Sequence, residues 1–186
     1  MELMTAIRGR RSVRAFRPDR LSRPEIEFLI EAAIQAPSAV NEQSWGFVVI
    51  EDQAVLQRYS KAIKPGVLAN LGSSYLPASF AKTLADPAYH VFHGAAALIV
   101  LYATSRDSFA AINCCLAAQN LMLAAFGQGL GSCWIGLTQG WLDHQTVKTE
   151  LGIPADWSAV APIIVGHPNE IPPAPPRASP KVIWRE

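Results

Sequence analysis

The longest apolar stretch of the chain, residues 109–126, constrains its fold more than any other feature. It contains no charged residue, and its only strongly polar side chains are Asn113, Gln119 and Asn120. A helix that lies on a protein surface has a polar face. This stretch, apolar nearly all round for about five turns, therefore predicts a helix buried on most sides. In a chain of 186 residues such a helix lies at the centre of the fold or packs against a second subunit.

The composition indicates one compact domain and excludes several classes of protein. Half of the residues are hydrophobic and 17% are charged, which is typical of a globular domain and not of a disordered chain. The formal net charge is only +1, whereas a nucleic-acid-binding protein usually carries a basic excess over a whole face. We therefore expect no nucleic-acid partner, and we expect residues 1–186 to form a single domain.

The cysteines and the N-terminus bear on the cellular compartment. The chain has three cysteines, two of them adjacent as Cys114 and Cys115, and no CxxC motif. This pattern argues against a disulfide framework or a zinc site and is consistent with a reducing compartment. The N-terminal residues show no long apolar segment typical of a signal peptide. Polar residues interrupt the apolar stretches before they reach the length of a membrane span. We expect a cytoplasmic protein without a membrane partner.

The remaining patterns predict a mixture of helices and strands. Ser22 and Glu25 have the spacing of a capping box, and Pro37 lies beyond the end of the helix that they begin. The order of the elements lacks the regular alternation of a doubly wound fold, so an α+β fold is predicted. Helices are expected at 3–9, from 22 to before 37, at 53–63, at 109–126 and from Asp143 to Leu151. Strands are expected at 45–50, 95–103 and 158–166, and a short strand or turn at 133–137.

Two segments do not fit a regular element. Residues 64–92 contain several prolines and glycines that are expected to interrupt any long element. This segment is a candidate lid or specificity insert. Residues 168–186 are proline-rich and cannot form a helix of their own, so we expect an extended tail that crosses a surface.

A run of arginines is the first chemical feature. Residues 8–16 read RGRRSVRAF. If this segment is extended, alternation places Arg10, Ser12 and Arg14 on one side and Arg11 and Val13 on the other. Two guanidinium groups and a hydroxyl would then face the same space. Such a run can be a solvated surface, a nucleic-acid patch or a pocket for a single phosphate.

Three further segments could complete a ligand site. The sequence APSAVNEQSWGF (36–47) places Ser38, Asn41 and Gln43 between a helix end and a strand start, where hydroxyl and amide groups can donate and accept hydrogen bonds. The glycines of GLGSCWIGL (129–137) allow the backbone to approach a ligand closely. Arg177 is a lone cation in an apolar, proline-rich context. A phosphate held by Arg10, Arg14 and Arg177 would accept charge-assisted hydrogen bonds.

Taken together, these segments resemble the nitroreductase family of FMN-dependent oxidoreductases. The motifs that carry the resemblance, in the family's order and spacing, are GRRSVRAF, APSAVNEQSWGFVVI, AAQNLMLAAFGQGLGSCWIG and VGHPNEIPPAPPR. They cover both ends of the chain and its middle. The resemblance implies a three-layer fold with a mostly antiparallel central sheet flanked by helices. It also implies an intertwined homodimer with FMN at the interface.

The resemblance also assigns roles to individual residues. Residues of four segments would bind FMN. One departure from the family pattern is Ser44, where the family often has proline, and we expect a slightly looser turn there. In the first segment, the phosphate, ribityl chain and pyrimidine edge would be bound by Arg10, Arg11, Ser12 and Arg14. In the second segment, which can belong to the partner chain, the FMN-binding residues would be Pro37, Ser38, Asn41 and Gln43. The flavin would be faced by Ile135, Gly136 and Leu137, and the phosphate would also be bound by Arg177.

The implied reaction is a ping-pong transfer of a hydride. NADH or NADPH would reduce the flavin, and a nitroaromatic, a quinone or a related small electrophile would then oxidise it. The flavin N5 carries this chemistry, so no side chain is expected to act as general acid or base, and no metal is expected. Arg14 is the candidate for the positive charge near flavin N1 and O2 that stabilises the reduced, anionic form.

Other functions remain possible from the sequence alone. A non-catalytic protein that stores or senses FMN would use the same residues. Related flavoproteins perform reductive dehalogenation or break down their own flavin. A nucleic-acid module that uses the arginine run is disfavoured by the near-neutral charge. His90 and His93 form an HxxH pair without further metal ligands nearby, so they are interpreted as loop or substrate-pocket residues.

Overall fold

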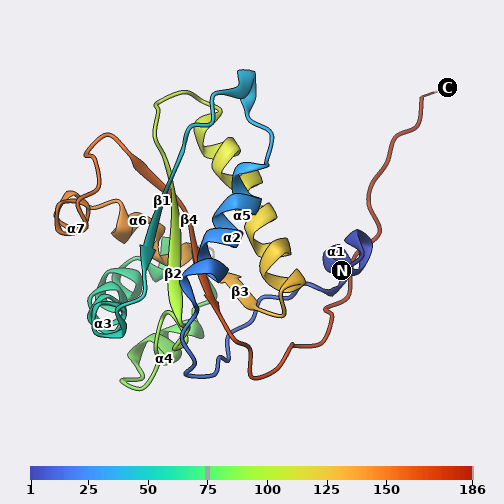
Figure 1. Ribbon diagram of the computed structural model, residues 1–186. Helices are drawn as coiled ribbons and strands as arrows, with labels where there is room; N and C mark the ends of the chain where they lie inside the picture. Colours follow the sequence, from blue (N-terminus) through green and yellow to red (C-terminus); the bar gives the residue numbers. More distant parts are fainter. Residues whose placement is uncertain (74–75, 186) are drawn as a thin grey trace.

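A four-stranded antiparallel sheet forms the middle of the computed structural model, which describes residues 1–73 and 76–185 (Figure 1). The order of the strands in the sheet is β1-β2-β4-β3. Each neighbouring pair is antiparallel. The strands are β1 (Trp45–Ile50), β2 (Ala97–Ala103), β3 (Gly131–Trp134) and β4 (Ser158–Gly166).

Helices connect and cover the strands. The α-helices are α1 (Leu3–Gly9), α2 (Arg23–Ile34), α3 (Gln53–Ala69), α4 (Phe80–Ala85), α5 (Ala110–Gly127), α6 (Gln139–Leu142) and α7 (Gln145–Glu150), and the short 3-10 helices are η1 (Ala39–Asn41), η2 (Leu71–Ser73) and η3 (Gly136–Thr138). The capping box expected at the start of α2 is confirmed. The Ser22 side chain accepts a hydrogen bond from the Glu25 N–H, and the Glu25 carboxylate accepts one from the Ser22 N–H.

The central strands are buried on both faces, which makes the fold a three-layer structure. Every residue of β2 is buried. Its alternate side chains enter two separate cores: Ile99 and Leu101 pack with α2 and α5, whereas Leu98 and Val100 pack with residues of α3 and α6. Figure 1 shows α2 and α5 on one side of the sheet and α3 and α6 on the other. The predicted α+β fold, with an antiparallel sheet between layers of helices, is confirmed.

The apolar stretch at residues 109–126 forms α5. This helix packs on the sheet and against α2, and residues such as Cys114, Ala118 and Leu121 are completely buried. Its other side exposes Ile112 and Leu116, at 51% and 42% of their surface. By length and composition alone α5 could cross a membrane, but here it covers the sheet. The helix is central, as predicted, and an apolar strip remains uncovered in the single chain.

Four predicted boundaries differ from the structure. The short strand or turn expected at 133–137 contains the end of β3, which spans Gly131–Trp134, and the turn into η3 after Ile135. The strand expected from residue 95 begins at Ala97, after the turn in which the Ala95 N–H bonds the Phe92 carbonyl. The helix expected to end at residue 63 continues through Pro65 to Ala69. Asp143 does not cap α7: His144 occupies that position.

Asp143 has another role, which explains its position. Its carboxylate forms an ion pair with the nearly buried Lys148, at 3.2 Å, and accepts a hydrogen bond from the Ala159 N–H. The Lys148 ammonium also donates to the carbonyls of Ala155 and Trp157. Asp143 thus ties α7 to the start of β4, a long-range contact that sequence spacing does not reveal.

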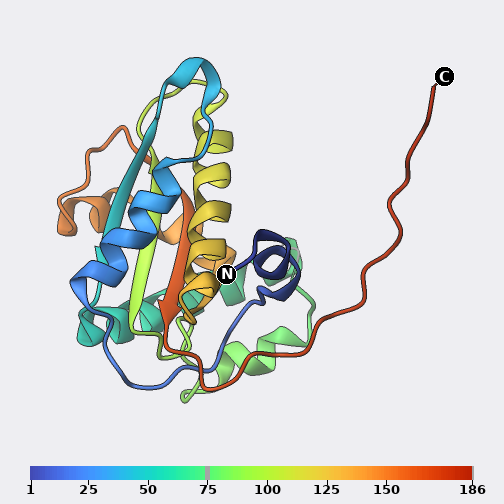
Figure 2. The same cartoon turned by 45° about the vertical axis from the view of Figure 1, so that its right-hand side comes forward.

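The two irregular segments have distinct structures. Residues 64–92 include the end of α3, η2 and the whole of α4, so this segment is more helical than its glycines and prolines suggested. Residues 74–75 in it, and Glu186 at the end of the tail, lie outside the described residues. The tail after residue 168 is extended, as predicted, but it does not cross a surface of the described part of this chain: it runs away from the body of the protein in both views (Figure 2).

Gly131 allows the arginine-bearing segment to lie against the edge of the sheet. The Val13 side chain is buried beside this glycine, and a Cβ atom at position 131 would lie 2.8 Å from Val13 Cγ1. Real Cβ atoms do not approach carbon this closely, so any larger residue would displace Val13 and the arginines that flank it.

We predict that Gly131→Ala reduces the free energy of unfolding by about 1–3 kcal/mol, as overpacking in a tight core usually does. Urea denaturation followed by circular dichroism measures this loss. Gly127→Ala is the control, because a Cβ at Gly127 meets no atom within 4 Å. Equal stability of the two variants would show that the segment around Val13 is loosely packed.

Candidate functional site

Backbone hydrogen bonds hold the arginine-bearing segment in an extended conformation. The Val13 N–H bonds the Ser132 carbonyl at 3.0 Å, and the Arg17 N–H bonds the His167 carbonyl at 2.8 Å. From the other side, the Asn169 N–H bonds the Ala15 carbonyl at 3.0 Å. The segment is therefore fixed between the start of β3 and the residues that follow β4. These contacts bring the N-terminal arginines and the C-terminal tail to the same edge of the sheet.

Arg10, Ser12 and Arg14, which the alternation places on one side of the segment, all lie near the Cys133 thiol of β3. All three act on the Cys133 thiol in β3: burial raises the pKa of that thiol, and Arg14, Ser12 and Arg10 each lower it. Arg177, in the tail, lies near Arg10. The pKa of Arg10 is lowered, first by burial and then by repulsion from the charges of Arg11 and Arg177.

The arginine cluster has no anionic partner in the described part of the chain. None of the ion pairs found there involves Arg10, Arg14 or Arg177. Arg11 differs from the others, because its guanidinium turns back to donate to the carbonyls of Arg8 and Arg10. Neighbouring positive charges that repel one another, without a carboxylate between them, fit a bound phosphate or another anion.

A buried hydroxyl beside the cluster also lacks a partner. Ser132 Oγ is buried and makes no hydrogen bond to any described residue. Ser132 pairs with Ser12 across a short parallel bridge, which places this hydroxyl next to the arginine-bearing segment. A buried polar atom without a hydrogen bond costs about 1–3 kcal/mol, and a ligand oxygen at the site would remove that cost. The residues present therefore fit a phosphorylated cofactor.

Arg14 also lines a groove of about 550 Å³. The predicted residues Ile135, Gly136 and Leu137 line the same groove, so the structure brings the first and third sequence segments together. Most of the opposite wall lies outside the predicted FMN-binding residues and includes residues of the 64–92 segment, the candidate lid or specificity insert. The further lining residues are Leu76, Phe80, Thr83, Tyr89, His93 and Trp134.

The groove presents one fixed positive charge and two neutral polar rings. Burial, with added repulsion from Arg14 and His90, lowers the pKa of His93 to about 4. Its imidazole is therefore neutral near pH 7. Burial raises the pKa of Tyr89, so its hydroxyl keeps its proton. The Tyr89 and His93 rings meet edge to face, with centroids 5.7 Å apart.

His93 has a backbone conformation that sequence reasoning missed. Its φ is +54°, followed by +66° at Gly94. Left-handed conformations are uncommon for residues with a side chain, and they cluster at functional sites. Glycine after a histidine was the only signal in the sequence that could have indicated this turn.

The second predicted segment forms a strained loop between α2 and β1. Val40, Asn41 and Gln43 all have positive φ, between +47° and +57°. Asparagine tolerates this conformation, but for a β-branched valine it is a clear outlier. The Ser38 hydroxyl accepts a hydrogen bond from the Gln43 N–H at 3.0 Å, and Val40 is 99% exposed at the tip of the loop.

Asn113, a polar residue in the apolar helix α5, fixes this loop from below. Its side chain is 1% exposed. Its carbonyl oxygen accepts from the Ala39 N–H at 3.1 Å, and its amide donates to Ser44 Oγ at 3.0 Å. Ser44, where the family often has proline, is held in place by the same network. Ser44 is buried, its hydroxyl is bonded to Asn113, and its carbonyl accepts from the Thr104 N–H.

The two groups of predicted residues lie apart in a single chain. The arginine-bearing segment precedes α2, and the loop that carries Ser38, Asn41 and Gln43 follows it. The helix α2 between them has twelve residues, so its two ends lie about 18 Å apart. Both views show the loop at one end of the molecule and the N-terminal segment near the other (Figures 1 and 2). Pro37 belongs to the same distant loop.

Known proteins are similar to this chain in sequence and in fold. The model of the nitroreductase family matches residues 7–167. A protein of Archaeoglobus fulgidus, provisionally named an NADH dehydrogenase/NAD(P)H nitroreductase, is 28% identical over 91% of this chain and 87% of the relative. The 5,6-dimethylbenzimidazole synthase of Rhodospirillum rubrum is 32% identical over 89% of this chain and 82% of that enzyme.

A solved structure has the same architecture over its whole length. The nitroreductase of Bacteroides fragilis, crystallised with bound FMN, superposes with a TM-score of 0.84 and covers 100% of both chains at 23% identity. The family match, which includes the arginine-bearing segment and the groove, agrees with the fold and the site described above. The chain belongs to the nitroreductase family.

Proposed function

We propose that this protein is an FMN-dependent oxidoreductase that uses NAD(P)H to reduce nitroaromatics, quinones or a related small electrophile. The observation that carries the proposal is the cluster of Arg10, Arg14 and Arg177, which has no carboxylate partner among the described residues and adjoins a groove. The names of the relatives in A. fulgidus and B. fragilis support the same activity and the same cofactor. The three free cysteines are consistent with a reducing, cytoplasmic location.

The cluster would hold the phosphate of FMN. Arg10 and Arg177 approach it from the two ends of the chain, and the hydroxyls of Ser12 and Ser132 lie beside them. Arg11 would act mainly through its charge, because its guanidinium is bonded to backbone carbonyls. Bidentate guanidinium groups match the geometry of a phosphate.

The groove would hold the flavin ring. Bound FMN would accept a hydride from NAD(P)H and pass it to the oxidant. The Ile135 N–H is already bonded to the Pro162 carbonyl. Gly136 and Leu137 begin η3, and the first N–H groups of a helix have no partner within it. They can therefore donate to the ring, and Arg14, in the same groove, would stabilise negative charge on it.

A second copy of the chain would complete the site. Ser38, Asn41 and Gln43 lie at the far end of α2 from the arginines, so in one chain they do not reach the groove. The exposed apolar side chains of α1 and α5, which pack together, form a surface that a monomer would leave in water. The apolar residues exposed there are Leu3, Met4, Ile7, Phe109, Ile112 and Leu116. A homodimer would bury this surface and bring one chain's loop to the other chain's groove.

The first prediction concerns the reductive half-reaction. Under anaerobic conditions, NADH or NADPH should bleach the absorbance of FMN bound to this protein, because the groove holds both a flavin and, in turn, a nicotinamide. The absorbance spectrum before and after each addition measures this, with free FMN at the same concentration as the control. FMN that is bound but not bleached by either nucleotide would indicate a flavin-storage protein instead.

The second prediction concerns the phosphate. Arg177→Ala should raise the Kd for FMN at least about tenfold, because a charge-assisted hydrogen bond contributes roughly 1.5–3 kcal/mol. Riboflavin, which lacks the phosphate, should bind the variant and the unmodified protein alike. Flavin fluorescence titration measures both constants. Arg185→Ala removes the same charge from the same exposed tail and is the control. An unchanged Kd for FMN would remove Arg177 from the site.

The third prediction tests the shared site. Asn113→Ala should weaken FMN binding about fivefold or more, roughly 1 kcal/mol, although Asn113 lies under the loop and not at the arginines. Asn120→Ala is the control, since Asn120 is on the same helix and bonds the Ala32 carbonyl of α2. Light scattering at micromolar concentration checks the dimer. A monomer, or equal FMN affinity in both variants, would contradict the shared site.

A further inference from the structure

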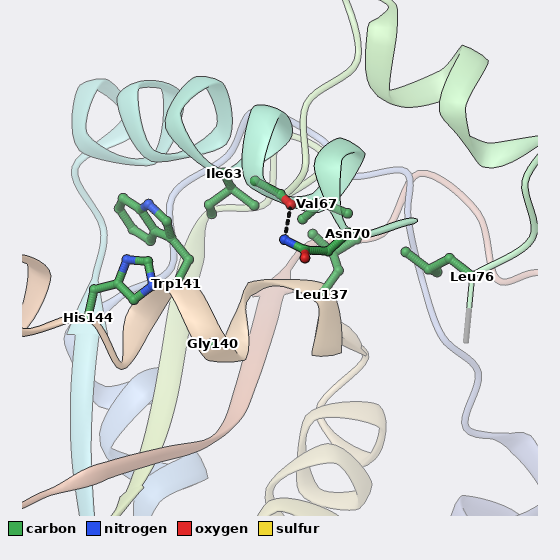
Figure 3. A pocket seen from close by; sticks show the side chains of 9 residues that line it. Ile63, Val67, Asn70, Leu76, Leu137, Gly140, Trp141 and His144 are labelled. Carbon is green, nitrogen blue, oxygen red and sulfur yellow. Dashed lines mark hydrogen bonds between the residues drawn. The ribbon is translucent and has the colours of Figure 1, made fainter. Parts of the chain in front are cut away.

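A second groove opens between α3 and α6, on the other side of Leu137 from Arg14. Its volume is about 330 Å³. Figure 3 shows Ile63 and Val67 on the α3 side, Trp141 and His144 on the α6 side, and Leu137 at the centre. The remaining lining residues are Gly66, Asn70, Leu76 and Gly140. This volume accommodates a small ring system, because a cavity of about 150 Å³ is enough for benzene.

Two glycines keep this groove open. Gly66 in α3 and Gly140 in α6 both line it, and a Cβ at either position would meet no atom within 4 Å. Neither glycine has the positive φ that would require glycine. A glycine inside a helix costs about 0.5–1 kcal/mol relative to alanine. Neither the backbone conformation nor the packing requires glycine at these two positions. The missing side chains leave space in the groove.

The groove is suited to an uncharged ring. Among the described residues that line it, none is an Asp, Glu, Lys or Arg. The Trp141 indole packs edge to face on Tyr59, with centroids 4.5 Å apart, so its position is fixed before a ligand arrives. Tyr59 itself is buried. A preorganised aromatic side chain beside aliphatic ones is typical of a site that binds an apolar aromatic group.

The two grooves adjoin one another. Leu76 and Leu137 line both of them. On one side of these leucines lie the charge of Arg14 and the polar rings of Tyr89 and His93, and on the other side the described lining contains no Asp, Glu, Lys or Arg. A ligand that lies across Leu137 would therefore meet a polar environment at one end and an apolar one at the other.

We propose that the groove between α3 and α6 is a subsite for the apolar ring of the oxidising substrate. The apolar ring of a fused bicyclic molecule lies in it, while the reducible polar end of the same molecule lies on the Arg14 side of Leu137. The second half of this assignment rests on the proposed oxidoreductase function. The binding of an uncharged bicyclic ring to the groove does not.

The direct test uses 2-naphthol, a neutral bicyclic compound that needs no turnover. Its binding is followed by quenching of tryptophan fluorescence, in the protein with and without added FMN. Gly140→Leu places a side chain in the groove and should raise the Kd for 2-naphthol at least about tenfold, since even one methylene group in an apolar pocket changes discrimination by about 10- to 200-fold. Gly66→Leu fills the groove from the other wall and should act alike.

Gly127→Leu is the matched control. It makes the same change at a helix glycine that also has open space around it but does not line the groove. Thermal denaturation confirms that each variant folds. The proposal is overturned if 2-naphthol binds the three variants and the unmodified protein equally, or if saturable binding is absent from the unmodified protein.

Turnover then tests the link to catalysis. The ratio of kcat/KM for 1,4-naphthoquinone to that for 1,4-benzoquinone should fall at least about tenfold in Gly140→Leu and stay constant in Gly127→Leu. A constant ratio in Gly140→Leu would separate the groove from the substrate path. Failure of the proposed function has a different signature, because FMN would then not be reduced by NAD(P)H in any variant.

Discussion

Burial of β2 on both faces is the constraint on which the rest of the structure depends. A strand whose every side chain is buried requires a layer of helices on each side of the sheet, and α2 with α5 on one face and α3 with α6 on the other supply them. The edge strand β3 is only four residues long. Beside it lies the arginine-bearing segment, which bonds Ser132, and the chain leaves β3 directly into η3. The candidate site is thus built where the shortest strand of the sheet ends.

Positive charge is concentrated at that edge of the sheet, where Arg10, Arg11 and Arg177 lie close together. The chain as a whole is nearly neutral, yet Arg10 is close enough to Arg11 and Arg177 for their repulsion to lower its pKa, after the effect of burial. Such repulsion destabilises the folded chain until an anion compensates it. The buried Ser132 hydroxyl, without a partner among the described residues, adds to this cost. A phosphate group bound at the site would compensate both the repulsion between the arginines and the missing hydrogen bond of Ser132.

Local patterns predicted the elements well, whereas they did not predict contacts between distant parts of the chain. The bounds of β1 and β4 agree with the expected strands, and the capping box of α2 is confirmed, because apolar runs and caps are properties of neighbouring residues. Pro65 was expected to interrupt its segment, yet α3 continues past it with Ile63 anchored in the core. The bonds of Asn113 to Ala39 and of Asp143 to Ala159 join residues more than ten positions apart, and no local pattern specifies them.

The same distinction applies to the candidate site. The motifs identified Arg14 and residues 135–137, which the structure brings to one groove, but they did not identify Phe80 or Thr83 on the opposite wall. Those residues come from a segment whose sequence has no repeating pattern. The assignment of the predicted residues to FMN stays a prediction, as does the role of the loop at Pro37–Gln43. The strain at Val40 was not predictable either, because a backbone dihedral angle of a valine leaves no trace in its sequence context.

The prolines of the C-terminal tail have a consequence for the kinetics of cofactor exchange. Pro168, Pro172, Pro173, Pro175 and Pro176 precede Arg177, and each restricts φ in the free chain as well as in a docked one. The tail therefore has few conformations to lose when its arginine engages an anion, so ordering it carries a small entropic cost. A contact that costs little entropy to form is restored readily after it opens, so the contact proposed between Arg177 and the phosphate would form again easily during cofactor exchange.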